Sequence, residues 1–372
     1  MRVLRIDKAS PYQQLIGVGG IGTGMLFALE GDHSLGRIES RPGRLLDVRD
    51  YCKLHIIIHY VAKLLGASHS GFPFHVLPVG KVGDDAPGRM LLNEMADVGI
   101  DTRFVRTIAG KPTLFSVCFQ YPNGDGGNIT TSNSAAAALS ETDLTGIGEV
   151  LASSGKRTIV LAAPEVPMTV RRRLLELATE AGALRVASLV SSEVMSVASS
   201  GMIQLVDLLS VNEEEAAMLV SCEFRPHDTE PFVDACLRLV AESAPDLRLI
   251  VTAGEHGAYG FGDGIWNYCP APRVGVASTA GAGDALLGGV LAAMAAGLPL
   301  LQPGAQRKAL TDSPLGTALE LGVLLASLKC LSPHTIHPYA SVDTLVQLAN
   351  DLELTLASEI NDSIAEGVLG VR

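Results

Sequence analysis

The sequence has 372 residues, of which 47% are hydrophobic and 18% charged, a composition typical of a globular protein rather than a disordered one. Its net charge of −12 argues against nucleic acid as a partner. No apolar stretch reads as a membrane span, the first residues lack the pattern of a secretory signal, and the six cysteines are scattered without a C-x-x-C pair. We therefore expect a soluble, cytoplasmic protein without a disulfide framework.

Glycines gather near the start of the chain, where residues 17–22 match the pattern G-x-G-x-x-G. Taken alone, this match suggests a dinucleotide-binding enzyme. That motif requires a strand before it and a sustained helix after it, but Gly31 soon interrupts the stretch 25–29 that follows. We interpret the glycines as one edge of a substrate site, and keep the dinucleotide-binding enzyme as the weaker alternative.

Residues 25–50 and 110–132 are expected to form a small β flap, or lid. The stretch 113–121 alternates, residues 123–126 supply turn chemistry, and residues 128–131 can return as a second strand. The side chains that share one face of the first strand are Phe115, Val117, Phe119 and Tyr121. Such a hairpin can cover one end of a parallel sheet.

Further along, short β-rich apolar runs alternate with helical patterns. The runs are residues 158–163, 186–190, 206–211 and 247–252, and the helical segments include residues 168–181 and 231–243. This alternation predicts βαβ units, a mostly parallel sheet and helices on both of its faces, which is a three-layer α/β/α fold. Residues 171–173 are three successive arginines in one of these segments, and we interpret them as an exposed helix face.

The strongest chemical signal is Ser278–Asp284, a glycine-rich segment that precedes an apolar helical stretch, 285–296, with Gly297 as its stop. A glycine-rich turn that opens a helix presents free N–H groups and the positive end of the helix dipole, which bind phosphate oxygens. Asp284 adds a carboxylate that can deprotonate an attacking hydroxyl. Anion-binding amides beside a base suit phosphoryl transfer. The alternative is a turn in which Asp284 only caps the helix.

Two other segments stand at the expected ends of strands. Thr252, Gly254 and Gly257 follow an apolar run, at the place where open α/β sheets bind ligands. Asn212 ends another run and Glu215 lies one helical turn beyond it, an arrangement that can organise the water shell of Mg²⁺. The alternatives are an ordinary turn in the first case and an asparagine N-cap in the second.

Taken in order, these segments resemble the ribokinase-like (PfkB-type) family of sugar and nucleoside kinases. Residues 278–284 resemble its D-T-x-G-A-G-D signature, and residues 212–215 its N-x-x-E motif. Residues 251–257 resemble its nucleotide-site turn, and residues 80–89 its G-x-V-G-x-D-x-x-G stretch. The resemblance covers roughly residues 55–340.

The resemblance implies that ATP phosphorylates a hydroxyl of a small sugar-like or nucleoside-like acceptor. Asp284 would be the base, and Asn212 and Glu215 would hold Mg²⁺ through water. The anion hole would comprise the amides of Gly281, Ala282 and Gly283, and the nucleotide contacts would be Thr252, Gly254, Gly257 and Thr279. The whole chain, 1–372, would form one kinase domain with a C-terminal extension at 350–372. Flaps in this family often pair between subunits, which implies a homodimer through the lid.

Several departures from the family pattern concern the acceptor. Ser278 replaces an aspartate that in many members belongs to a monovalent-cation site, so potassium activation is not expected from the sequence. Gly24 stands where the family usually has a sugar-binding aspartate, and residues 50–55 replace its glycine-rich substrate segment. We therefore assign Gly24, Lys53 and His55 to the acceptor site, with solvated surface as the alternative for Lys53 and His55. A non-catalytic, ligand-binding protein with the kinase fold remains the main alternative.

Overall fold

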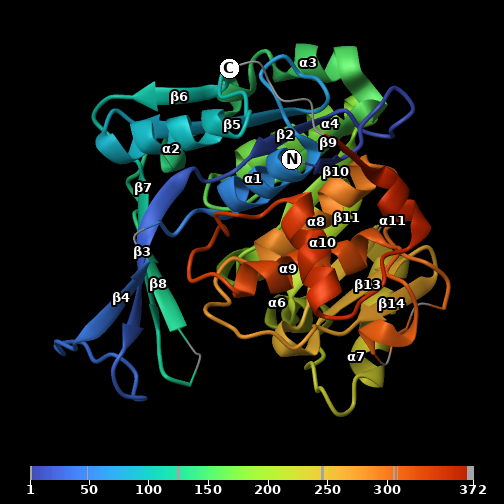
Figure 1. The fold of residues 1–372 in the computed structure, drawn as a ribbon. Coiled ribbons are helices and arrows are strands. Elements are labelled where there is room, and N and C mark those ends of the chain that lie inside the picture. Colours follow the sequence, from blue (N-terminus) through green and yellow to red (C-terminus); the bar gives the residue numbers. More distant parts are fainter. Residues whose placement is uncertain are drawn as a thin grey trace.

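The centre of the fold is a nine-stranded sheet with helices on both faces, and a smaller sheet projects from one end (Figure 1). The structure is a computed structural model that describes residues 2–47, 49–123, 126–243, 247–304, 306–307 and 309–366. The three-layer α/β/α fold with a β flap predicted from the sequence is confirmed. No helix in the described ranges is both long and apolar enough to cross a membrane.

The order of strands places the carboxyl ends of seven of them along one edge in the described part of the chain. In spatial order the strands are β14 (Ile265–Cys269), β13 (Ala258–Gly262), β12 (Arg248–Thr252), β11 (Leu208–Asn212), β10 (Leu184–Ser188), β9 (Thr158–Ala162), β2 (Gln14–Val18), β5 (His75–Gly83) and β6 (Val105–Ile108). From β12 to β6 all neighbours are parallel, whereas β13 and β14 are antiparallel. Open α/β sheets bind ligands at such a carboxyl edge.

Helices cover this sheet on both faces. The α-helices of the described ranges are α1 (Lys53–Leu65), α2 (Ala86–Asp97), α3 (Ile147–Ser154), α4 (Met168–Ala181), α5 (Val194–Ser199), α6 (Glu213–Val220), α7 (Glu230–Ser243), α8 (Ala282–Ala295), α9 (Ala318–Cys330), α10 (Val342–Asp351) and α11 (Ser358–Ser363), of which α10 packs on α9 and α11 on the small terminal sheet. Helix α4 has the predicted bounds, and α8 begins three residues before the predicted apolar stretch, inside the glycine-rich segment.

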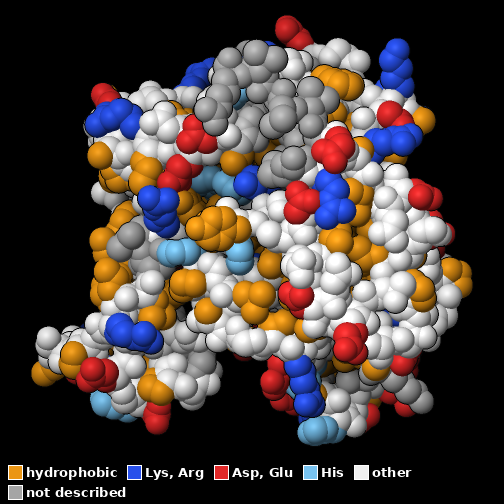
Figure 2. Space-filling view, in the orientation of Figure 1, with side chains coloured by type: hydrophobic (Ala, Val, Ile, Leu, Met, Phe, Trp, Pro, Cys, Tyr) orange, Lys and Arg blue, Asp and Glu red, His pale blue; other side chains and the backbone are white. Residues whose placement is uncertain are grey.

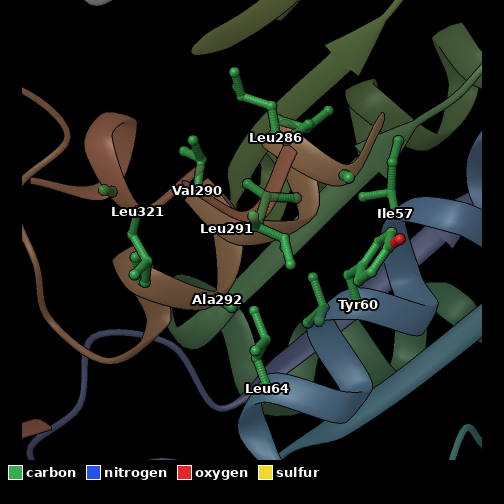
Figure 3. Packing of buried hydrophobic residues seen from close by; sticks show 14 of the residues in the cluster. Ile57, Tyr60, Leu64, Leu286, Val290, Leu291, Ala292 and Leu321 are labelled. Carbon is green, nitrogen blue, oxygen red and sulfur yellow. The ribbon is translucent and has the colours of Figure 1, made fainter. Parts of the chain in front are cut away.

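The apolar core holds the start of α8 in a fixed place. Figure 3 shows side chains of α1 facing those of α8, among them Tyr60 and Leu291. A Cβ at Gly288 would lie 2.9 Å from Cβ of Tyr60, and one at Gly289 would lie 3.0 Å from Cα of Gly322 in α9. The two glycines therefore let α8 approach α1 and α9 closely, which fixes the helix that carries the predicted catalytic aspartate.

A separate four-stranded sheet forms the flap. Its order is β4 (Gly43–Asp47), β3 (Gly22–Leu29), β7 (Leu114–Gln120) and β8 (Gly126–Thr130). The predicted hairpin is confirmed, because β7 and β8 pair antiparallel. Residues 124 and 125 of its turn lie outside the described residues. Figure 2 shows open space between the tip of the flap and the lower part of the body.

The two faces of the flap differ in chemistry. Ser116 of β7 is buried on the face toward the body, whereas Ile129 of β8 is 69% exposed on the other face. The apolar residues that pair across strands on this outer face are Met25, Phe27, Leu45, Val117, Phe119 and Ile129. The alternating apolar residues of the sequence, such as Val117 and Phe119, therefore lie on the outer face of the flap and not on a side buried in the core.

Asp85 ties the root of the flap to the body. Its carboxylate caps α2 by accepting from the backbone N–H of Gly88, and it also accepts 2.8 Å and 2.5 Å hydrogen bonds from the N–H and hydroxyl of Thr113. The Thr113 hydroxyl in turn accepts from the N–H of Gly83. The start of β7 is therefore fixed to the end of β5 and the start of α2.

The two ends of the described chain pair with each other. Strand β1 (Arg2–Leu4) is antiparallel to β15 (Ile364–Glu366). The expected helical extension at 350–372 therefore consists of the end of α10, the short helix α11 and a strand, and residues 367–372 lie outside the described residues. The periodicity of the sequence carries no sign of this long-range pairing.

The weaker alternative for residues 17–22 and one part of the interpretation of the three arginines are wrong. No helix follows Gly17–Gly22, because this segment leads from β2 directly into β3, which removes the context that a dinucleotide-binding motif requires. Arg171 is not on an exposed face of its helix, since its side chain is fully buried. Its guanidinium donates to both carboxylate oxygens of Glu193 and to the carbonyl of Ser188, so it ties α4 to the carboxyl end of β10.

Candidate active site

A cleft of about 180 Å³ at the carboxyl edge of the sheet brings most of the predicted site residues together. The predicted residues that line it are Lys53, Asn212, Glu215, Thr252, Thr279, Gly281, Ala282, Gly283 and Asp284. Ser188 and Ser210, at or near the ends of β10 and β11, line it too and were missed by sequence reasoning. Their position at strand ends was the available signal.

Asp284 lies in the first turn of α8 and is buried beside a single cation. Nζ of Lys53, in the first turn of α1, lies 3.6 Å from Oδ1 of Asp284. Burial raises the pKa of the Asp284 carboxyl, and Lys53 offsets part of this rise. Burial lowers the pKa of Lys53, but Asp284, Glu215 and Glu165 together raise it above its ordinary value. Each member of the pair therefore favours the charged form of the other, while burial opposes the charge on both.

The start of α8 presents free backbone amides to the cleft. Gly281 is the N-cap, with a φ of 78° that favours glycine, and no side chain caps the helix. The amide of Ala282 donates to the carbonyl of Thr279, so this predicted member of the anion hole is already engaged. Among the described residues, the amides of Gly281, Gly283 and Asp284 have no acceptor. These three N–H groups, at the positive end of the helix dipole, can bind an anion.

Comparison with known protein families agrees with this geometry. The model of the pfkB family carbohydrate kinases matches residues 60–341, well over half of the chain and including the whole start of α8. The chain belongs to the pfkB family of carbohydrate kinases. No curated protein sequence matches it significantly.

Solved structures share the fold of this pfkB family member at low sequence identity. The ribokinase of Cryptococcus neoformans var. grubii serotype A, solved with ADP, has a TM-score of 0.70 and 18% identity, covering 90% of this chain and 99% of its own. The ribokinase of Arabidopsis thaliana, solved with ribose and ATP, has a TM-score of 0.63 and 19% identity, covering 93% and 100%. Aminoimidazole riboside kinase of Salmonella enterica has a TM-score of 0.61 and 18% identity, covering 90% and 99%. These likenesses show the ribokinase-like fold.

Asn212 and Glu215 take up the capping role that the sequence offered as an alternative. They form a capping box at the start of α6, with Oδ1 of Asn212 accepting from the Glu215 amide and Oε2 of Glu215 accepting from the Asn212 amide. The second oxygen of Glu215 is 3.4 Å from the Ser191 hydroxyl. Burial raises the pKa of Glu215, and Lys53 offsets part of this rise. The cap thus aims a buried carboxylate into the cleft of this kinase.

Two predicted nucleotide residues lie outside the cleft. Gly254 and Gly257 belong to the turn between β12 and β13, and neither lines the cleft. A Cβ at Gly257 would lie 2.1 Å from the carbonyl oxygen of Cys269, and its φ is 87°. The backbone requires glycine at position 257 for the turn itself, whatever ligand is bound. Thr252, at the end of β12, does line the cleft.

Two predicted acceptor residues are placed elsewhere than expected. The ring of His55 is fully buried and packs on Tyr51 with a centroid distance of 4.7 Å, so His55 belongs to the core and not to the cleft. Gly24 lies at the root of the flap, where a Cβ would be 2.4 Å from Oγ of Ser116. No side chain fits at position 24 in this backbone, which explains why the expected aspartate is missing there. Of the three residues assigned to the acceptor site, only Lys53 lines the cleft.

Glu165 is a buried carboxylate close to Lys53 that sequence reasoning missed. It follows the carboxyl end of β9 and adopts a φ of 72°, a conformation rare for residues other than glycine. Burial raises the pKa of its carboxyl to about 7, while Cys52 and Lys53 act against this rise. Its Oε2 is buried and has no hydrogen-bond partner among the described residues. A strained residue with one unsatisfied carboxylate oxygen beside Lys53 is typical of a ligand-binding position.

Asp50 places another carboxylate at the root of the flap. Its Oδ2 accepts a 2.8 Å hydrogen bond from Sγ of Cys118 and lies 3.3 Å from the Ser116 hydroxyl, and its amide donates to the carbonyl of Gly24. Ser116 is the residue that pairs with Gly24 across β3 and β7. Asp50 therefore brings a carboxylate to the side of the flap where position 24 itself has no room for one.

Proposed function

We propose that this chain transfers the terminal phosphoryl group of ATP to a hydroxyl of a small sugar-like or nucleoside-like acceptor. The observation that carries the proposal is the first turn of α8. There, a buried carboxylate, Asp284, lies beside the free amides of Gly281 and Gly283 in one cleft. A module that only bound phosphate would need the amides, but it would not need a base beside them.

The chemistry follows from these positions. The acceptor oxygen attacks the terminal phosphorus of ATP, the bond from that phosphorus to the bridging oxygen of ADP breaks, and Asp284 takes the hydroxyl proton. The raised pKa of Asp284 makes it a better proton acceptor than an exposed aspartate. The amides of Gly281, Gly283 and Asp284 stabilise the charge on the transferred group. Lys53 keeps Asp284 ionised and oriented before the acceptor arrives.

The residues present fit a hydrated Mg²⁺ ion. Glu215 is a buried carboxylate that lines the cleft, and its capping bonds leave acceptor capacity on its two oxygens. Glu215, with Asn212 positioning it, would hold the ion through water, and the ion would neutralise charge on the phosphates of ATP. The oxygen of Asn212 is occupied by the cap, so its part is to place Glu215.

The acceptor would lie between α1 and the flap. Glu165 and Asp50 offer carboxylates to sugar-like hydroxyls, and Lys53 offers an ammonium group at the same place. The face of the flap that carries Ser116 and Cys118 is turned toward these groups, since both bond to Asp50. Closure of the flap would exclude water, which competes with the acceptor as nucleophile. A second copy of the chain would cover the apolar outer face of the flap.

A thermal-shift screen of the purified chain tests this proposal. It combines MgATP, MgADP or NAD with a panel of sugars, nucleosides and sugar acids, because a ligand that binds the folded state raises the melting temperature. We expect stabilisation by MgATP together with one acceptor, and that acceptor then enters a phosphoryl-transfer assay. Acceptor binding without any nucleotide effect would instead favour the non-catalytic ligand-binding protein, and stabilisation by NAD alone would contradict the proposal.

A further inference from the structure

Lys329 lies in the last turn of α9 with its side chain fully buried. Its Nζ donates a 2.7 Å hydrogen bond to the carbonyl oxygen of Ser278, the residue that opens the glycine-rich loop. The amide of Ala277 donates to the carbonyl of Cys330 at 2.8 Å, next to the lysine. The loop that presents the anion-binding amides is thus fixed at its start to the end of α9.

A buried ammonium group at this place needs a physical reason. Removing a charge from water is costly unless polar groups replace the water, and an apolar side chain of similar size could fill the same space without that cost. Two features favour the charge of Lys329 here. The carbonyl of Ser278 accepts a hydrogen bond from its Nζ, and the negative end of the α9 dipole lies beside it.

Resting on the proposed function, we propose that the ammonium group of Lys329 is a built-in cation that positions the anion-binding loop and makes a soluble monovalent cation unnecessary. Potassium ions bind proteins mainly through carbonyl oxygens that replace their hydration shell. Nζ of Lys329 likewise places a positive charge against a carbonyl oxygen, that of Ser278, but this cation is covalently part of the chain. Position 278 also carries a neutral serine, which offers no carboxylate to a bound cation.

Lys329 acts through the loop and does not touch the reacting atoms. It is absent from the lining of the cleft, whereas Thr279, the residue next to its hydrogen-bond partner, lines it. Lys329 is therefore a positioning residue for the amides of Gly281 and Gly283. Its loss would disturb the binding of a phosphoryl group in transfer more than the binding of the nucleotide alone.

The test compares wild type with Lys329→Met and Lys329→Arg, and uses Lys63→Met as the matched control. Lys63 also lies in the last turn of a helix, α1, but away from the loop. The probe is MgADP with aluminium fluoride, which mimics the phosphoryl group in transfer, in KCl or choline chloride at equal ionic strength. Dissociation constants are measured by calorimetry for this complex and for MgADP alone.

We expect wild type, Lys329→Arg and Lys63→Met to bind this complex equally well in both salts. Lys329→Met should bind it about 10- to 100-fold more weakly in choline chloride, the usual range for a residue that acts through a neighbour. KCl should restore part of the affinity, and binding of MgADP alone should change little. Equal affinity of Lys329→Met and wild type, or no recovery in KCl, would overturn the proposal.

Thallous ions give a readout that does not depend on kinase activity. Anomalous diffraction from crystals soaked in thallous acetate should show an ion at the Ser278 carbonyl in Lys329→Met and none there in wild type. An ion at that carbonyl in wild type would overturn the role of Lys329 even if the methionine variant fails to fold. Failure of wild type to bind MgADP would contradict the proposed function, while the thallous-ion result would still decide the question about Lys329.

Discussion

Lys53 and Asp284 face each other across the start of two helices, with Nζ and Oδ1 3.6 Å apart. Burial raises the pKa of Asp284, and the ammonium group lowers it again in part. The net effect leaves the carboxyl more basic than an exposed aspartate, and the ammonium group favours its ionised form. Helices α1 and α8 pack on each other through an apolar core, so the distance is set by the fold (Figure 3).

Removing the cation should move the pH dependence of the reaction. In Lys53→Met the pKa of Asp284 is expected to rise further, because its largest opposing influence is lost. A smaller fraction of Asp284 is then ionised at a given pH, so the acidic limb of the kcat profile should shift to higher pH. The measurement is kcat against pH for wild type and variant. A limb that stays in place would show that Lys53 does not act on the base.

Replacing the proposed base should separate catalysis from binding. Asp284→Asn keeps the shape of the side chain but cannot take a proton, so kcat should fall by about 10²- to 10⁴-fold. The dissociation constant of MgADP, measured by calorimetry, should change little. Full activity of this variant would mean that Asp284 is not the base.

Glu165→Gln should stabilise the chain at high pH. Burial raises the pKa of Glu165 to about 7, so between pH 4.5 and 7 the folded state keeps a proton that the unfolded state has lost. Wild type therefore loses stability as the pH rises through this window, whereas glutamine does not titrate. The free energy of unfolding of the variant should exceed that of wild type increasingly from about pH 5 to 7, and by a constant amount above it. Urea titrations at several pH values measure this difference, and a constant difference over the whole range would refute the assignment.

Glu215→Gln should raise the concentration of Mg²⁺ needed for half-maximal activity. Glutamine can still accept from the Asn212 amide, so the capping box and the fold should survive. Only the negative charge facing the proposed hydrated ion is removed. Activity is measured against total Mg²⁺ at fixed ATP. An unchanged Mg²⁺ dependence would reject Glu215 as part of the metal site.

The apolar outer face of the flap predicts a dimer. Ile129→Asp places a charge at the β8 end of the row that contains Met25 and Val117, and should convert a dimer into a monomer in light scattering. Met195→Asp is the control, because Met195 is similarly exposed on α5, away from the flap. A wild-type chain that is monomeric at micromolar concentration would contradict this prediction.

Patterns within short segments were sufficient to predict the layers of the fold and the first turn of α8. Glycine spacing and an adjacent aspartate are local features, and they led directly to Gly281, Gly283 and Asp284. The apolar runs likewise predicted the parallel strands, since a strand buried on both faces is apolar throughout. Helix α4, in which period and length agree, has the predicted bounds.

Side chains whose role depends on distant partners were missed or misread. In the sequence Arg171 is indistinguishable from a surface arginine. Only the structure shows that β10 and Glu193 surround its side chain. Glu165, Asp50 and Lys329 likewise meet their neighbours from other segments, which no spacing in the sequence predicts. His55 was misplaced because its helix, α1, is buried along most of its length, and only its first residue, Lys53, lines the cleft.

The side chain of Glu165 occupies the space that a side chain at position 20 would need, and this has an evolutionary consequence. A Cβ at position 20 would lie 2.6 Å from both Cβ and Oε2 of Glu165, so any larger residue there would displace the carboxylate. The two positions are therefore expected to change together. Under the proposed function, in which Glu165 contacts the acceptor, relatives that retain glycine at position 20 keep room for an acidic residue at position 165. A lineage that acquires a bulkier residue at position 20 would have to lose the acidic group at position 165. It would then also lose the substrate preference that this group is proposed to confer.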